Sequence, residues 1–147
     1  MDTNTRAKAL STATGISHSD LIGILNNELG DPKALDEFVK YGDIFAKANA
    51  ISPILHIVSG NTPEAAIQSV TRGLLVGAKN LVKLPRYGIK EFDDFLDKLP
   101  LEMLNLVETS SRRETSNEWI DLAQLIIIFG SDETVVDIAS RTSPLQK

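Results

Sequence analysis

Four short apolar runs, separated by segments of helical length, constrain the fold of this chain more than any other feature. Each run is five residues long and rich in Ile, Leu and Val, and the runs occupy residues 54–58, 80–84, 103–107 and 125–129. Short apolar runs that alternate with helical segments are typical of βαβ units, whose parallel strands are buried on both faces. The sequence therefore predicts an α/β fold: an open parallel Rossmann-like sheet of about four strands with flanking helices and right-handed crossovers.

The segments between and after these runs carry helical signals. Four helices are predicted, and they begin at Pro63, Ile89, Asn117 and Asp132. In the helix that begins at Asp132, Val135, Ile138 and Ala139 recur on one face, so we expect these three side chains to face the sheet.

The chain before Pro53 follows a helical pattern instead. Ser17 offers an N-cap for a helix that ends at Gly30, and Asp31-Pro32 offers the start of a second helix. Residues 1–14 are interpreted as a frayed arm or a loose helix. The second helix is predicted to turn these side chains inward: Leu35, Phe38, Val39 and Ile44 or Phe45. We therefore predict an α-helical N-terminal lead-in over residues 1–50 and a partial Rossmann-like cofactor-binding domain over residues 51–147.

Composition excludes several classes of site. There is no cysteine, which excludes disulfides, thiolate metal ligands and a cysteine nucleophile within this chain. The two histidines lie 38 positions apart, a spacing that disfavours a zinc centre, and no metal is predicted. No apolar run approaches the roughly 18 residues that cross a bilayer, and the first residues do not resemble a secretory signal. A cytoplasmic protein without membrane association is the expectation.

Charge is distributed unevenly along the chain. Residues 51–90 carry five basic side chains against one acidic, whereas residues 91–147 carry five against twelve. A small phosphate-bearing ligand suits the positive middle, and ordinary solvated helix faces explain it equally well. Nucleic acid is not an expected partner, because it calls for a broader basic surface and for aromatic side chains, and the middle holds only Tyr87.

The ends of the predicted strands indicate where a ligand would bind. In open parallel sheets, ligands bind beyond the carboxyl ends of the strands, where helix N-termini present free N–H groups. The four predicted ends lie at residues 59–63, 83–86, 108–113 and 130–133. Small and polar residues at these ends indicate a nucleotide-binding edge, although the sequence contains neither the G-x-G-x-x-G dinucleotide fingerprint nor a P-loop.

Several of these motifs resemble a known family. Ser-Gly-Asn-Thr-Pro at 59–63, Gly-Leu-Leu-Val-Gly at 73–77 and Asn-Leu-Val-Lys-Leu-Pro at 80–85 resemble the cofactor-binding start of the aldehyde dehydrogenase superfamily. Three further stretches are similar to its acyl-CoA reductase branch, the long-chain fatty-acid or acyl-protein reductases: residues 31–39, the Leu-His-Ile run at 55–57 and Phe-Gly-Ser-Asp-Glu-Thr at 129–134. The resemblance covers about residues 31–140.

The resemblance implies a chemistry and assigns roles. Members reduce a fatty acyl thioester to an aldehyde with NADPH, through a thioester on a cysteine. Asn61 matches the asparagine whose side-chain amide donates to the developing oxyanion, and its alternative role is to cap the helix that opens at Pro63. The cofactor contacts that the resemblance implies are Ser59, Gly60, Lys83, Pro85, Arg86, Gly130 and Ser131.

For three of these cofactor contacts, the residue type itself indicates a role or an alternative to it. Lys83 matches the lysine that reaches the adenosine ribose; the alternative is a lysine that extends to solvent at the sheet edge. Arg86 would suit a 2′-phosphate and so indicates NADP(H). Ser131 matches a pyrophosphate contact, but it is also a good N-cap, and Asp132 and Glu133 beside it favour the helix dipole while repelling phosphate.

Two other features have alternative interpretations. His56 lies inside an apolar run, where a hydrogen-bonded core histidine is the simpler interpretation than a catalytic base. Arg112 and Arg113 lie in a Ser/Thr-rich segment that is either a solvated turn or a phosphate contact.

The missing cysteine bears on function most. The resemblance places the nucleophile downstream of the matched region, so this chain is expected to be the N-terminal portion of a reductase and inactive alone, with acyl-CoA or an acyl-carrier thioester as the partner of the complete enzyme. An exposed apolar sheet edge also predicts a homo-oligomer or a multi-subunit reductase. The alternatives are a non-catalytic α/β module that binds a nucleotide or a protein, and a fragment without a function of its own.

Overall fold

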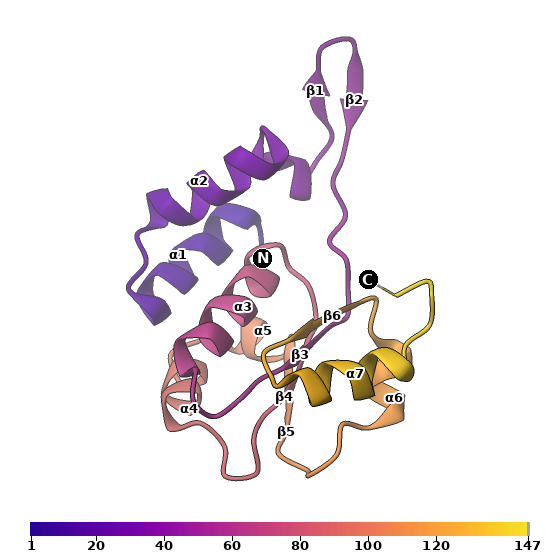
Figure 1. Ribbon diagram of the computed structural model, residues 1–147. Helices are drawn as coiled ribbons and strands as arrows, with labels where there is room; N and C mark the ends of the chain where they lie inside the picture. Colours follow the sequence, from indigo (N-terminus) through magenta and orange to yellow (C-terminus); the bar gives the residue numbers. More distant parts are fainter. Residues whose placement is uncertain (147) are drawn as a thin grey trace.

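A four-stranded parallel sheet lies at the centre of the computed structural model, which describes residues 1–146 (Figure 1). Its strands are β3 (Ile54–Ile57), β4 (Asn80–Lys83), β5 (Val107–Ser110) and β6 (Leu125–Ile128), in the order β5-β4-β3-β6. All three pairings are parallel. The open α/β sheet predicted from the sequence is therefore confirmed, with three of its strands where the apolar runs lie.

The third strand is displaced from its predicted position. The prediction placed it at residues 103–107, but α5 (Leu101–Leu104) is a helical turn, and its N–H groups at Met103 and Leu104 donate to the Pro100 carbonyl at 2.9 and 3.0 Å. The side chain of Met103 extends from this turn into the core, where it is buried. β5 is an edge strand with exposed polar residues at 108 and 109, so hydrophobicity marked the preceding turn instead of the strand.

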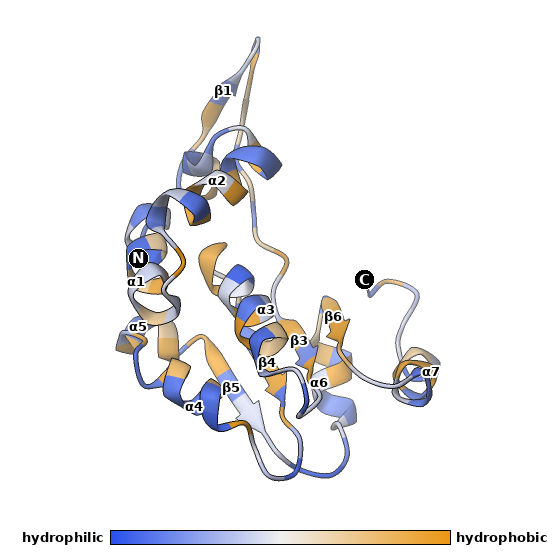
Figure 2. Ribbon diagram, turned by 60° about the vertical axis from the view of Figure 1, so that its left-hand side comes forward, coloured by the Kyte–Doolittle hydropathy of each residue, from blue (hydrophilic) through white to orange (hydrophobic). Residues whose placement is uncertain are grey.

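Helices cover both faces of the sheet, as Figure 1 shows. One face packs against α3 (Pro63–Leu75) and α4 (Lys90–Leu96), and these two helices share a buried cluster with the N-terminal helices. The other face packs against α6 (Asn117–Leu122) and α7 (Asp132–Ser140), where Ile120 and Ile138 are buried against β3, β4 and β6. Figure 2 shows β3 and β6 in the hydrophobic colour between these layers. The helices predicted to begin at Pro63, Asn117 and Asp132 are confirmed.

The packing of α7 differs from the prediction. Ile138 is buried, but Val135 is 41% exposed and Ala139 is exposed as well. The inward orientation predicted for these two residues was therefore wrong. The sheet ends at β6, so α7 has only one strand edge to cover, and a single residue of its apolar stripe is enough to make that contact.

The N-terminal segment begins with α1 (Thr3–Thr14) and α2 (His18–Leu29). α1 is a well-formed helix: Asp2 caps it by accepting from the Thr5 N–H at 2.8 Å. The buried Arg6 fastens it to the sheet domain by donating to the Leu75 carbonyl at 2.9 Å. The predicted caps of α2 at Ser17 and Gly30 are confirmed.

A β-hairpin replaces the second helix predicted from residue 31. After a single 3-10 turn, η1 (Pro32–Leu35), the chain forms β1 (Val39–Tyr41) and β2 (Ile44–Ala46), which pair antiparallel and project from the body (Figure 1). Gly42 at φ 58° supplies the turn. The inward orientation predicted for Phe38, Ile44 and Phe45 was wrong, because these side chains are 69%, 64% and 67% exposed.

Within residues 1–146, no helix is long and apolar enough to cross a bilayer. The division of the chain at Pro53 stays a prediction. The helices before it share one hydrophobic cluster with α3, α4 and β4 after it.

Candidate functional site

The strand order creates a crevice at the carboxyl edge of the sheet. The chain runs from β3 outward to β4 and β5, then returns to place β6 on the other side of β3. At such a switch point the two connections leave in opposite directions and open a gap between neighbouring strands, the usual ligand site of open α/β sheets. Here the gap holds a hollow of about 500 Å³, the switch-point crevice, lined by Ser59, Asn61, Thr62, Phe129, Gly130 and Ser131.

The predicted loops meet along one edge of the sheet. Ile57 pairs with Lys83 on one side and with Ile128 on the other, so β3, β4 and β6 end at the same level. A Cβ added to Gly60 would touch Pro85 Cγ at 3.5 Å, which shows that the loops after β3 and β4 are in contact. The structure thus brings residues 59–61, 83–85 and 130–131 to a common rim.

The loop after β3 holds Asn61 by its oxygen. Ser59 Oγ donates to Asn61 Oδ1 at 2.7 Å and lies 3.0 Å from Thr62 Oγ1. This contact uses the acceptor side of the amide and leaves the NH₂ as the group that could donate to a ligand. The N-cap of α3 is Thr62, without a side-chain cap bond, so the alternative role of Asn61 as the cap of this helix has no support in the geometry.

The start of α7 forms the opposite wall of the crevice. Ser131 is its N-cap, and the Thr134 N–H donates to Ser131 Oγ at 3.4 Å. A Cβ added to Gly130 would lie 3.2 Å from Thr134 Cβ, so glycine keeps this approach open. The first-turn N–H groups and the helix dipole favour an anion here, whereas Asp132 and Glu133 in the same turn oppose one.

Lys83 lies beside a second hollow, away from the crevice. The side chain is 9% exposed, and Nζ donates to the Leu84 carbonyl at 2.7 Å. Burial lowers the pKa of the Lys83 ammonium. The hollow, here called the β5 hollow, has a volume of about 280 Å³ and is lined by β5, by the loop after it and by the start of α6. Lys83 therefore does not extend freely to solvent at the sheet edge.

Arg86 stands apart from both hollows. It is exposed, and its guanidinium carbon lies 5.7 Å from the centroid of the Tyr87 ring, which is itself 92% exposed. In the described part of the chain it lines neither the crevice nor the β5 hollow.

His56 belongs to the core, as the simpler interpretation predicted. It is fully buried, with Nδ1 2.8 Å from Ser69 Oγ and Nε2 2.9 Å from Asn80 Oδ1. The Asn80 amide is oriented by its own bond to the Ala78 carbonyl at 2.8 Å, so Oδ1 accepts from His56 Nε2–H and Nδ1 accepts from the Ser69 hydroxyl. Burial lowers the pKa of His56 to about 4, which keeps the ring neutral at pH 7.

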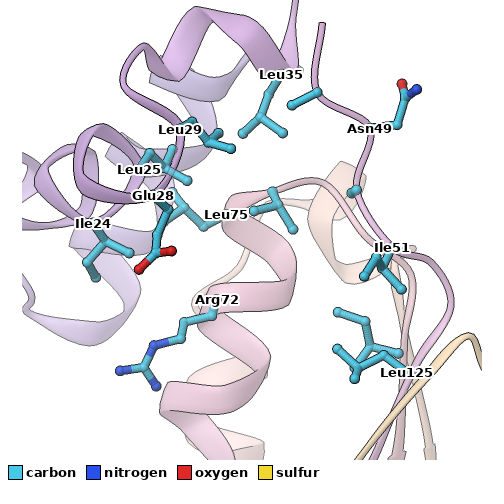
Figure 3. A pocket seen from close by; sticks show the side chains of 14 residues that line it. Ile24, Leu25, Glu28, Leu29, Leu35, Asn49, Ile51, Arg72, Leu75 and Leu125 are labelled. Atoms are coloured by element: carbon cyan, nitrogen blue, oxygen red, sulfur yellow. The ribbon is translucent and has the colours of Figure 1, made fainter. Parts of the chain in front are cut away.

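A cavity with a mainly apolar lining lies at the other end of the sheet. It has a volume of about 420 Å³ and lies between α2, α3, residues 48–51 and the first residues of β3 and β6. Figure 3 shows Glu28 and Arg72 as charged side chains of a lining made mostly of leucine and isoleucine. Ile54 and Leu125 mark the amino ends of their strands, so this cavity is remote from the predicted rim.

Sequence reasoning missed several residues of the two hollows. Thr62 and Ser110 fell within the predicted strand ends at 59–63 and 108–113, but the sequence did not single them out as contacts. Phe129 was placed in the fourth apolar run, and Trp119 only in a predicted helix; they line the crevice and the β5 hollow respectively. The polar residues after each apolar run were the signal for Thr62 and Ser110, and no such signal marks Phe129 or Trp119.

Comparison with known proteins gives one family. The sequence model of "Acyl-CoA reductase (LuxC)" matches residues 2–147. The chain is 33% identical over 67 residues to a "Long-chain acyl-protein thioester reductase" of Aliivibrio fischeri and 31% identical over 67 residues to one of Photobacterium phosphoreum. It is 29% identical over 68 residues to one of Vibrio harveyi. Each matched stretch covers 46% of this chain and 14% of the relative, so the similarity spans about a seventh of these proteins.

Proposed function

This chain belongs to the acyl-CoA reductase (LuxC) family, and on that premise we propose that its switch-point crevice binds NADP(H) for the reduction of a fatty acyl thioester to an aldehyde. The observation that carries the proposal is the crevice itself. Polar and glycine residues from the ends of β3 and β6 face one hollow at the point where the strand order reverses.

The residues at the rim fit a dinucleotide. Gly130 lines the crevice without a side chain where a pyrophosphate would approach, and the N-terminus of α7 supplies N–H donors with Ser131 at its cap. Lys83, at the end of the neighbouring strand, would reach the adenosine ribose. Ser59 and Pro85 complete the rim, as donor to Asn61 and as the contact of Gly60.

Asn61 is the residue of this chain that we place beside the reacting carbonyl. Its oxygen is held by Ser59, so its NH₂ would donate to the oxyanion that forms when the acyl carbonyl is attacked. A donor of this kind typically lowers the barrier by about 3 kcal/mol, or roughly 10²–10³ in rate. NADPH supplies the hydride when it is bound, and the acyl group must be carried by a nucleophile that this chain does not contain, since it has no cysteine.

The coenzyme proposal is tested by calorimetric titration of the 147-residue chain with NADPH. The informative variant is Ser131→Asp, because aspartate caps a helix as well as serine does but places a negative charge where the pyrophosphate would lie. We expect wild-type binding and at least a tenfold loss in this variant. Ser17→Asp, which makes the same change at the N-cap of the remote α2, is the matched control and should bind like the wild type.

A test of the role of Asn61 needs a reductase that contains this segment together with a nucleophilic cysteine. There, Asn61→Ala should lower kcat about 100-fold or more while the affinity for NADPH stays unchanged. Equal turnover of the variant and the parent would remove Asn61 from the proposed mechanism. A chain that binds no NADPH at millimolar concentration would favour a non-catalytic protein-binding module instead.

We also propose that the complete protein is oligomeric. Phe38, Ile44 and Phe45 stand exposed on and beside the projecting hairpin, and β6 leaves an apolar strand edge open. Exposed apolar surface and an unpaired strand edge both favour association.

A further inference from the structure

The cavity between α2 and α3 lies at the amino end of the sheet, where the proposed function places no ligand. It has a volume of about 420 Å³ and is here called the α2–α3 cavity. Its walls come from α2, α3, the segment 48–51 and the first residues of β3 and β6 (Figure 3). Ligand pockets in proteins are concave, mainly apolar and about 300–1,000 Å³ in volume. The α2–α3 cavity therefore has the size of a small-molecule site.

The lining of the α2–α3 cavity is largely aliphatic. Leu25, Ile54 and Leu75 are at most 6% exposed and form a buried floor. Half-buried or exposed aliphatic side chains surround this floor: Ile24, Leu29, Leu35, Ile51, Val76 and Leu125. An apolar protein cavity of about 150 Å³ holds one benzene, or roughly 25 Å³ for each carbon. At that ratio the α2–α3 cavity holds on the order of 15 carbon atoms, the size of a long aliphatic chain.

The rim of the cavity carries one charge of each sign. Glu28 stands on α2 and Arg72 on α3, both exposed, and no other lining residue in the described part of the chain is charged. Among residues 1–146, neither of the two side chains is ion-paired. The guanidinium is free to donate to a carbonyl or hydroxyl oxygen, whereas the carboxylate repels a carboxylate on a ligand. The rim therefore favours a polar head group without net charge over a fatty acid.

We infer that the α2–α3 cavity binds one long unbranched aliphatic chain with an uncharged oxygen head group, as a second ligand site separate from the coenzyme edge. For the identity of the chain the inference rests on the proposed function, whose product, a fatty aldehyde, is a molecule of this kind. Ile54 and Leu125 begin β3 and β6, whereas the switch-point crevice lies beyond the ends of the same strands. Each strand has four residues and spans about 10 Å, so the two sites can be occupied together.

Titration of the 147-residue chain with 1-decanol, followed by backbone amide shifts in NMR spectra, tests this site. 1-Decanol has an uncharged oxygen on a long chain and, unlike an aldehyde, does not react with lysine amines. We expect saturable shifts at residues 24–29, 48–54 and 72–76. From 1-hexanol to 1-decanol the affinity should rise about threefold to fourfold with each added methylene, because each one is removed from water in the cavity.

Two variants test the floor and the rim separately. Ala50 lines the cavity, so Ala50→Trp should fill it and weaken 1-decanol binding at least tenfold, whereas Ala139→Trp on the exposed side of α7 is the matched control. Glu28→Gln removes the carboxylate from the rim and should tighten the binding of decanoate at least threefold while that of 1-decanol stays unchanged. Glu64→Gln, at the remote first turn of α3, should leave the affinity for both ligands unchanged.

The outcomes separate this inference from the proposed function. Shifts that do not saturate, or that centre on the exposed Phe38 and Phe45 of the hairpin, would overturn it. Wild-type affinity for 1-decanol in Ala50→Trp would do the same, and if that variant does not fold, equal affinities of 1-hexanol and 1-decanol for the wild type decide against the cavity. Binding of 1-decanol here without any binding of NADPH would refute the proposed function and leave the aliphatic site standing. Binding of NADPH without 1-decanol would refute this inference alone.

Discussion

The buried imidazole of His56 should make the fold sensitive to acid. Its folded-state pKa of about 4 lies below the ordinary value of 6.5. The unfolded chain therefore takes up a proton at this residue at a pH where the folded chain does not. The contribution of the neutral ring to stability is complete above pH 6.5 and is lost as the pH falls towards 4. At about 1.4 kcal/mol per pKa unit, the full loss is about 3 kcal/mol, a large share of the 5–15 kcal/mol that stabilises a typical domain.

Urea unfolding between pH 7.5 and 4.5 measures this effect. In His56→Gln, which cannot titrate, the free energy of unfolding should fall less over this range than in the wild type, by about 2–3 kcal/mol. His18→Gln removes the chain's other imidazole, which makes a surface contact with Asn4 at 2.9 Å, and should keep the wild-type difference. Parallel pH profiles for wild type and His56→Gln would refute the reasoning, because they would mean that burial does not hold the ring neutral.

Three further predictions concern packing, helix capping and association. Gly73→Ala should destabilise the fold by about 2 kcal/mol or more in thermal unfolding, because the new Cβ would lie 2.0 Å from Asn80 Oδ1. The control is Gly23→Ala in α2, which has open space around it and should stabilise the fold by about 0.5–1 kcal/mol. Ser131→Ala should cost about 1 kcal/mol in urea unfolding, because the Thr134 N–H loses its acceptor. Phe45→Ser should shift the molecular mass measured by sedimentation towards that of the monomer. The unfolding midpoint should not change, because the side chain is 67% exposed. An unchanged molecular mass would exclude the hairpin as a contact between subunits.

Most of the sheet was predictable because its strands are rich in Ile, Leu and Val. β3, β4 and β6 coincide with three of the predicted runs, although His56 interrupts β3 and polar residues stand at both ends of β4, and the residues after these runs locate the rim. β5 was misplaced because Val107 is its one apolar residue, and the polar residues Glu108, Thr109 and Ser110 that follow give no apolar run.

The hairpin escaped prediction for a different reason. Phe38, Ile44 and Phe45 are spaced as an inward helical face would be, yet they face outward. Hydrophobic periodicity indicates which apolar side chains lie on the same side of a segment, but it does not indicate whether that side is covered. An exposed apolar surface is therefore easily mistaken for part of the core.

The candidate site was predicted only in part. The motifs placed Asn61, Gly130 and Ser131 at strand ends, and the parallel register then brought them together. The position of Arg86 outside both hollows could not be predicted, because it depends on the direction in which the loop after β4 leaves the sheet.

The most direct test of the central claim is a residue-by-residue map of NADPH binding, by backbone amide shifts in NMR spectra of the 147-residue chain. We expect the largest changes at residues 59–62 and 129–131, with smaller ones at Lys83. Changes centred on the apolar cavity around Ile51 and Arg72, at the opposite end of the sheet, would contradict the claim, and so would a spectrum unaffected by millimolar NADPH.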